Sequence, residues 1–177
     1  MKVSIITVVY NNVTTIEDTI LSVASQTHPN FEHIIVDGVA TDGTLAIIKK
    51  HHDKITTTIS EPDHGIYDAM NKGIKLASGD VVGMLNSDDI YFDSSVISTV
   101  VNQFKTKKVD SVFADLVYVN GDNLQKVVRY YRSAGFEPGR FAYGFMPAHP
   151  TFFTRREVYE KYGLFKTNYK IASEHNG

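Results

Sequence analysis

Short apolar runs alternate with amphipathic stretches along the first part of the chain. Val3–Val9 is β-branched and almost entirely apolar, which is typical of a strand covered on both faces of a parallel sheet. Apolar residues then recur at helical intervals from position 16 to position 24, and Pro29 forbids further continuation. Thr14 and Glu17 have the spacing of a capping box. The pattern therefore predicts a strand followed by a helix.

Further strand-then-helix patterns follow along the chain. The pattern predicts strands at residues 33–36, 55–60 and 80–85, and helices at residues 44–51, 66–77 and 94–104. This alternation predicts an α/β fold, a Rossmann-like, mostly parallel sheet with helices on both faces. Residues 111–119 and 126–132 flank Asn120 and Gly121, which predicts an antiparallel excursion with a turn somewhat longer than two residues. We therefore expect a mixed sheet.

The last part of the chain is less regular. Residues 135–150 contain three Gly and three Pro, which suits a long connection that lines a ligand. Residues 155–162 predict a short helix. Because the sequence shows no internal repeat or linker, we expect a single domain over residues 1–177.

Composition and charge exclude several classes of protein. Eighteen Lys and Arg against twenty Asp and Glu give a net charge of -2, which argues against nucleic acid as a partner. The absence of Cys excludes disulfides, thiolate metal sites and a Cys nucleophile. The first apolar run is too short for a signal peptide or a membrane span. We expect a cytoplasmic chain, and contact with the inner face of a membrane through a small patch stays open.

Polar residues follow each predicted strand, at the edge where an open parallel sheet binds its ligands. Because most of them are acidic, an anionic ligand would need a divalent cation such as Mg²⁺ or Mn²⁺ to bridge it to the carboxylates. The same residues also suit helix caps and turns, and this alternative stays open for Asp37 and Asp42. The residues are Tyr10, Asn11, Asp37, Asp42, Glu61, Asp63, Asp88 and Asp89.

Two adjacent carboxylates, Asp88 and Asp89, come directly after an apolar strand. Like charges in such proximity cost free energy unless a cation or solvent offsets them, which favours a metal site over capping. The chain has no Gly-rich dinucleotide fingerprint, no Walker-type loop and no Gly-x-Ser-x-Gly elbow. Dinucleotide redox chemistry, ordinary ATP hydrolysis and α/β-hydrolase chemistry are therefore not expected.

Three motifs together resemble the family 2 glycosyltransferases. They are the first strand with Tyr10 and Asn11, the stretch from Asp37 to Thr44, and Leu85-Asn86-Ser87-Asp88-Asp89. The stretch from Glu61 to Gly73 is similar to bacterial members that assemble surface polysaccharides. The resemblance implies a GT-A fold and inverting transfer from a nucleotide-sugar, with uridine as the expected base, to a hydroxyl of a glycan or lipid-linked saccharide.

The resemblance also assigns roles to individual residues. Asp37 would hydrogen-bond the base, and the helix that borders the donor would contribute three polar side chains. An ordinary solvated helix face is the alternative for these three. The residues that the resemblance places around the donor are Thr7, Val9, Tyr10, Asn11, Asp37, Asp68, Asn71, Lys72, Asn86 and Ser87.

The family's metal motif, Asp-x-Asp, departs from its usual form here and reads Asn86-Ser87-Asp88. Asp88 stands at the position that usually holds the metal, with Asp89 beside it. His149 resembles the family's His that joins the metal or diphosphate shell, and a hydrogen-bonded His in a Pro-rich loop is its alternative.

The general base implied by the resemblance is Glu174, which stands where the family usually has Asp. Arg155 and Arg156 are weaker candidates, either for binding a phosphate or for a solvated face. Family members continue into helices that shape the acceptor site, so a truncated, non-catalytic module that binds the nucleotide-sugar is the main alternative. A sugar nucleotidyltransferase is a more distant one, because the loop after the first strand is neither basic nor Gly-rich.

Overall fold

Four parallel strands form the centre of the fold, as the apolar runs predict. The computed structural model describes residues 1–121, 123–133, 135–137, 139 and 147–167. The strands are β1 (Val3–Val9), β2 (Phe31–Asp37), β3 (Thr57–Ser60) and β4 (Val81–Met84), in the spatial order β3-β2-β1-β4. Every residue of β1 is buried, because β1 lies inside the sheet with helices on both faces.

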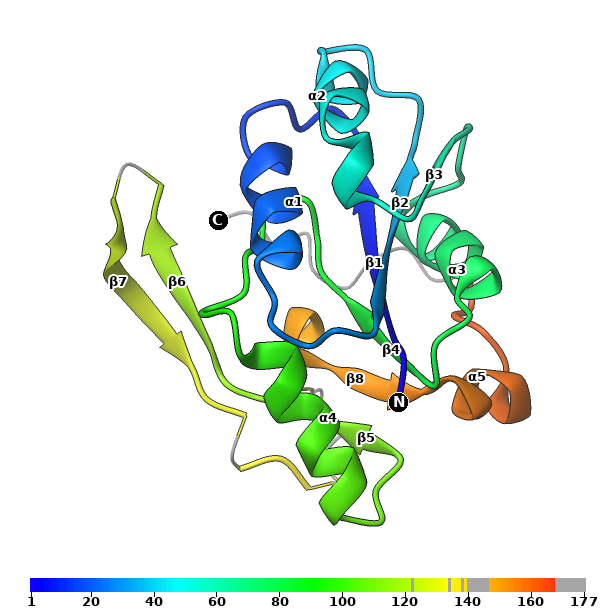
Figure 1. The fold of residues 1–177 in the computed structure, drawn as a ribbon, viewed down its shortest axis with the longest axis vertical. Coiled ribbons are helices and arrows are strands. Elements are labelled where there is room, and N and C mark those ends of the chain that lie inside the picture. The colour runs from blue at the N-terminus through cyan, green and yellow to red at the C-terminus, as the bar shows by residue number, and fades with distance from the viewer. Residues whose placement is uncertain (122, 134, 138, 140–146, 168–177) are drawn as a thin grey trace.

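Helices cover both faces of this sheet, which confirms the predicted layers. They are α1 (Ile16–Ala24), α2 (Thr44–Lys50), α3 (Ile66–Leu76), α4 (Val96–Thr106) and α5 (Arg156–Tyr162), with a 3-10 turn, η1, at His52–Lys54. Ile5 packs in the core shared with α1 and α4, whereas the next residue, Ile6, packs on the α3 side. Figure 1 shows α1 and α3 on opposite sides of the central strands. Within the described ranges, no helix is long and apolar enough to cross a membrane.

The sheet is mixed, but the antiparallel strand is not the predicted one. β8 (Phe153–Arg155) pairs antiparallel with β4 and with β5 (Ser111–Val112). The ring of Phe153 packs directly on Gly83, where any side chain would collide with it. A three-residue strand gives almost no periodic signal, so the sequence pattern could not reveal β8. A 3-10 turn, η3 (His149–Thr151), precedes it.

The predicted strand at residues 111–119 is divided in two. Its second part, β6 (Leu116–Asn120), pairs with β7 (Asn123–Tyr131) in a separate two-stranded sheet. Asn120 pairs with Asn123, so the turn is shorter than predicted. The excursion is therefore an independent hairpin and not an extension of the main sheet.

The predicted capping box at the start of α1 is wrong. Thr15 occupies the cap position, and no side chain caps the helix. The Thr15 hydroxyl instead donates a hydrogen bond of 2.8 Å to the carbonyl of Ser87, in the loop after β4. A tertiary contact thus replaced the local one, and it ties the start of α1 to the edge of the sheet where the candidate site lies.

Candidate functional site

The carboxyl ends of β1 and β4 define the candidate site. β2 pairs with one edge of β1, and β4 pairs with the other edge, so the direction of strand order changes at β1. This is the switch point at which open α/β sheets bind ligands. Among the residues that the structure describes, two other than Gly have a positive φ, Asn11 at 47° and Val39 at 68°, and both lie in loops at this edge. Such backbone is costly for a β-branched residue such as Val39, and it is common at functional sites.

The residues around the end of β1 differ sharply in exposure. Thr7 has no exposed surface, and its hydroxyl lies 3.0 Å from Nε2 of the buried His33. Thr7 therefore belongs to the interior, contrary to its predicted place in the pocket wall. Val9 is also buried, beside Asp37 on the neighbouring strand, whereas the ring of Tyr10 is 65% exposed. Asn11 accepts a 2.7 Å hydrogen bond from the Thr41 amide, which joins the loops after β1 and β2.

Asp37 is fully buried at the end of β2. Its carboxylate accepts hydrogen bonds from the amide of Ala40, at 3.1 Å, and from the hydroxyl of Ser60, at 2.6 Å. The next residue, Gly38, is closely surrounded, because a Cβ there would lie 2.6 Å from the carboxylate of Asp63 and 3.3 Å from the ring of Tyr10, so a larger residue would require these side chains to move. In this structure Asp37 therefore holds the turn, which is the alternative left open above.

Asp42 also shapes a loop at this edge of the sheet. Asp42 accepts hydrogen bonds from the Thr44 hydroxyl and the Val13 amide, and the Thr44 bond lowers the pKa of its carboxyl.

Asn12 is a site residue that the sequence patterns did not predict. It donates a hydrogen bond of 2.9 Å to the hydroxyl of Ser87. This bond joins the loop after β1 to the loop after β4. The sequence signal that could have revealed Asn12 is its position directly after Asn11.

The loop after β4 carries the predicted metal motif. Asp88 is exposed, and Asp89 is partly buried. Burial, together with the charge of Asp88, raises the pKa of Asp89 to about 6. Asn86 donates a hydrogen bond of 3.1 Å to Asp89, while the buried Oδ1 of Asn86 has no hydrogen-bond partner. The crowding of negative charge expected from the sequence is therefore present.

The predicted metal ligands do not form one cluster. In the part of the chain that the structure describes, no group of three or more His, Asp or Glu side chains is placed to hold a metal. His149 lines a pocket with Met84 and Phe165, and its buried Nε2 has no hydrogen-bond partner. Burial also lowers the pKa of His149. The structure thus does not bring His149 together with Asp88 and Asp89 as a set of metal ligands.

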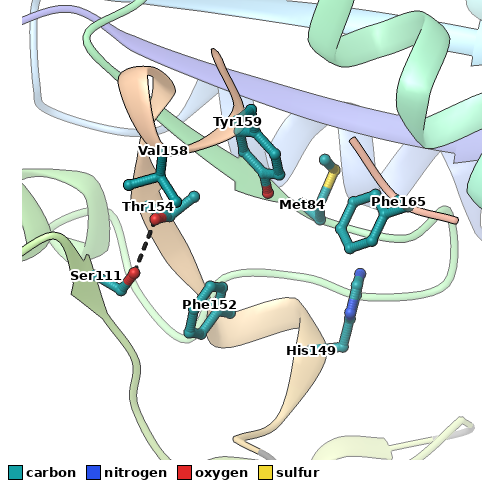
Figure 2. A pocket seen from close by; sticks show the side chains of 8 residues that line it. All are labelled: Met84, Ser111, His149, Phe152, Thr154, Val158, Tyr159 and Phe165. Carbon is teal, nitrogen blue, oxygen red and sulfur yellow. Dashed lines mark hydrogen bonds between the residues drawn. The ribbon is translucent and has the colours of Figure 1, made fainter. Parts of the chain in front are cut away.

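The pocket that contains His149 has a volume of about 180 Å³ and lies between β4, β8 and α5. Figure 2 shows the rings of Tyr159, Phe165 and His149 around it. Burial raises the pKa of Tyr159 to about 12, so its hydroxyl remains protonated at neutral pH. Most of the wall is apolar; the lining residues are Met84, Ser111, His149, Phe152, Thr154, Val158, Tyr159 and Phe165.

The three polar residues of α3 make internal contacts. Asn71 is buried and bonds the backbone of Phe165 on both sides of its amide, so it does not face a donor. Lys72 donates to the carbonyl of Pro62 and pairs with Glu61 and Asp68. Burial opposes its charge, but the hydrogen bond that Lys72 donates to Glu61 and the charge of Asp68 together raise the pKa of Lys72.

Asp68 stabilises the start of α3. Its carboxylate accepts a hydrogen bond from the His64 amide, which lowers its pKa, and the positive charge of Lys72 lowers it further. Both Asp68 and Lys72 therefore anchor the loop between β3 and α3, at the same edge of the sheet as Gly38.

Arg155 and Arg156 lie at the opposite end of β4. Arg155 pairs with Val81, the first residue of β4, and its side chain donates to the carbonyl of Val109. Arg156 donates to the carbonyl of Gly79 and pairs with Glu160. Both therefore lie away from the carboxyl edge of the sheet and do not line the candidate site. The predicted base, Glu174, lies outside the described residues.

The sequence profile described as "Glycosyl transferase family 2" matches residues 4–163 of the chain. The chain belongs to this family. The resemblance drawn from the motifs is thereby confirmed, and the mostly parallel sheet with helices on both faces confirms the expected GT-A fold.

Several relatives share this fold or sequence. A PGL/p-HBAD biosynthesis glycosyltransferase of Mycobacterium bovis is 28% identical over 156 residues, which are 86% of this chain and 59% of that protein. TuaG of Bacillus subtilis, a putative teichuronic acid biosynthesis glycosyltransferase, is 42% identical over 90 residues, covering 49% of this chain and 36% of that protein. The chain thus spans little more than half the length of the first of these relatives, and about a third of the second.

Solved structures of glycosyltransferases share the fold of this chain. TarS residues 1–349 of S. aureus, in complex with UDP, has a TM-score of 0.79 at 25% identity and covers 97% of this chain, which in turn covers 52% of that protein. A mannosyltransferase of Pyrobaculum calidifontis, in complex with GDP-Man and Mn²⁺, has a TM-score of 0.72 at 18% identity. The match covers 94% of this chain and 48% of the mannosyltransferase. The second likeness shows the fold alone.

Proposed function

We propose that this chain is the donor-binding part of an inverting glycosyltransferase in surface polysaccharide synthesis. It takes a sugar from a UDP-sugar and transfers it to a hydroxyl of a glycan or a lipid-linked saccharide. The observation that carries this proposal is the bond between Asn12 and Ser87, which joins the loop of Tyr10 to the loop of Asp88. Family membership, the UDP complex of TarS and the name of TuaG support the class of reaction.

The exposed ring of Tyr10 suits the base of the donor. A planar base gains stacking energy on an aromatic face, and the tyrosine at the end of β1 is 65% exposed. Gly38 keeps the space beside this ring clear of a side chain. In this proposal Asp37 recognises the base after its hydrogen bond with Ser60 is exchanged for one with the ligand.

The oxygen atoms after β4 suit a hard divalent cation, Mn²⁺ or Mg²⁺. Asp88 would hold it, with Asp89 beside it and the unpartnered Oδ1 of Asn86 nearby in the same loop. The raised pKa of Asp89 fits a site that gains stability from a positive charge. When bound, the cation supplies charge to stabilise the departing diphosphate.

The reaction in this proposal is a single in-line displacement. The acceptor oxygen forms a bond to the anomeric carbon on the face opposite the diphosphate, whose bond to that carbon breaks, and the configuration inverts. Glu174 is the proposed general base and takes the proton of the acceptor hydroxyl. The loops at the carboxyl edge hold the donor, so that the anomeric carbon is correctly oriented.

The alternative is a module that binds the nucleotide-sugar without transferring the sugar. Sugar transfer by the 177-residue chain alone would exclude this alternative.

Calorimetric titration of the chain with UDP, GDP, CDP and dTDP, each with and without Mn²⁺, tests the donor site. We expect UDP to bind most tightly and to require the cation. Equal binding of all four nucleotides would contradict a uridine site, and binding that ignores Mn²⁺ would contradict the metal. If no nucleotide binds to the folded chain, the proposed donor site is wrong.

A further inference from the structure

The β6–β7 hairpin is exposed on both of its faces. Strand side chains alternate between two faces, yet seven of the nine residues of β7 are exposed, and the other two, Val127 and Tyr131, are half-buried. Among the described elements, β6 and β7 pack chiefly on each other. Figure 1 shows the hairpin projecting beside the main sheet. An isolated two-stranded hairpin is marginally stable in water, so a partner surface would stabilise it.

Large apolar and aromatic side chains occupy this exposed ribbon. Tyr130 is 67% exposed and Val128 is 58% exposed, and Tyr118 and Leu124 are each nearly half-exposed. Tyrosine is typical of the boundary between water and lipid, because its ring is apolar and its hydroxyl is polar. Burying these side chains in such a boundary would remove apolar surface from water.

The hairpin also carries positive charge, although the whole chain has a net charge of -2. Residues 116–132 contain Lys126, Arg129 and Arg132 against a single acid, Asp122. The guanidinium of Arg129 lies over the ring of Tyr118, 5.4 Å from its centroid. At the base of the hairpin, the carboxylate of Asp115 accepts a hydrogen bond from the Ser133 amide. The exposed charges on the strands themselves are therefore all positive.

We propose that the β6–β7 hairpin docks this protein on an anionic lipid surface. The cations attract acidic headgroups, and Leu124, Val128 and Tyr130 enter the boundary below them. A second copy of the chain fits less well, because pairing two hairpins would bring Lys126 and Arg129 near their own equivalents. An acidic polysaccharide would match the charge, but it would leave the apolar side chains in water. This inference does not depend on the proposed function.

A single tryptophan gives a direct test, because the chain has none of its own. In Tyr130→Trp, the indole is expected to shift its emission to shorter wavelength when vesicles of phosphatidylcholine and phosphatidylglycerol are added. The matched control is Tyr162→Trp on α5, where the native ring is 73% exposed and no shift is expected. Pure phosphatidylcholine vesicles should give little change with either variant.

Charge reversal tests the electrostatic part. Lys126→Glu with Arg129→Glu is expected to weaken vesicle co-sedimentation by more than about tenfold, since each cation near an anionic membrane contributes substantially to binding. Lys49→Glu with Lys75→Glu changes the net charge equally at exposed sites on α2 and α3, and should weaken binding far less. Added salt should weaken binding of the unaltered chain. Circular dichroism establishes that each variant is folded.

Three results would overturn the proposal. The first is an unshifted Tyr130→Trp emission with anionic vesicles, and the second is equal loss of binding in the two charge-reversal pairs. The third is a concentration-dependent dimer, measured by light scattering, that the Lys126→Glu and Arg129→Glu pair dissociates. That dimer would assign the hairpin to a second copy of the chain.

Discussion

Asn71 and Phe165 bond each other through their amide groups, although they lie 94 positions apart. Asn71 Nδ2 donates to the carbonyl of Phe165 at 2.8 Å, and the Phe165 amide donates to Asn71 Oδ1 at 2.9 Å. The ring of Phe165 then stacks on Tyr67 and contacts Tyr159. This pair therefore fastens the segment after α5 to α3 and builds one wall of the pocket in Figure 2.

Removal of this clamp should destabilise the fold. In Asn71→Ala, the Phe165 backbone loses both partners in a partly buried place, so we expect the free energy of unfolding to fall by about 2 kcal/mol. Urea denaturation measures this change. Asn102→Ala, at an exposed position of α4, is the matched control and should change it by less than about 0.5 kcal/mol. Equal stability of the two variants would show that the clamp contributes nothing.

Gly73 sets the distance between α3 and β1. A Cβ at this position would collide with the side chain of Ile6. Alanine gains about 1 kcal/mol over glycine in a helix, whereas overfilling a packed core costs about 1–3 kcal/mol, so Gly73→Ala should be destabilising on balance. Thermal unfolding checks this, with Lys75→Ala as an exposed control in the same helix. A raised melting temperature for Gly73→Ala would contradict the close packing.

Stability should fall in acid in two stages. Burial lowers the pKa of His33 from 6.5 to about 3, so the unfolded chain binds a proton that the folded chain does not. Stability is therefore lost as pH falls below about 6.5, by up to about 1.4 kcal/mol per pH unit. Urea denaturation across this range should show the slope. His33→Gln should flatten it above pH 4.5, and exposed His52→Gln should not.

Glu32 adds a second stage below pH 4.5. Burial opposes its charge, but hydrogen bonds from Lys2, Ser4 and Ser78 outweigh burial and lower its pKa from 4.5 to about 2. The unfolded state again binds more protons, so stability falls further between these two pH values. Glu32→Gln should remove this stage and leave the stage of His33 unchanged. A single steep loss in both variants would contradict the assignment.

Asp88 and Asp37 have different roles in the proposed donor site: Asp88 would bind the metal, and Asp37 would recognise the base. Asp88→Ala should abolish the Mn²⁺ dependence of nucleotide binding and leave the fold intact, whereas exposed Asp18→Ala on α1 should leave that dependence unchanged. Calorimetry measures both. Persistence of the Mn²⁺ dependence in Asp88→Ala would exclude Asp88 as the ligand.

Asp37→Ala should reduce discrimination among UDP, GDP, CDP and dTDP more than it reduces the effect of Mn²⁺. Asp42→Ala is the control, because Asp42 accepts hydrogen bonds from Thr44 and Val13 and holds the neighbouring loop. It should weaken every nucleotide to a similar degree. The same uniform loss in Asp37→Ala would show that Asp37 only holds the turn with Ala40 and Ser60.

The layers of the fold and the family both follow from local patterns in the sequence. Val3–Val9 could only be a strand buried on both faces, and α3 had a single apolar stripe, because these periodicities follow from local geometry. The motifs after β1, β2 and β4 identified the family, and all three lie at one edge of the sheet. These features depend on neighbouring residues, and so the pattern contains them.

Contacts between distant residues, in contrast, establish which polar side chains are free to meet a ligand. Asn71 and Thr7 looked equivalent to Tyr10 in the sequence, yet Asn71 bonds Phe165 and Thr7 bonds His33 in the interior. Tertiary structure also made β8 a strand and left the β6–β7 hairpin outside the main sheet. A hydrogen bond or a strand pair between residues far apart in the chain leaves no periodic trace, because its geometry exists only once the chain has folded.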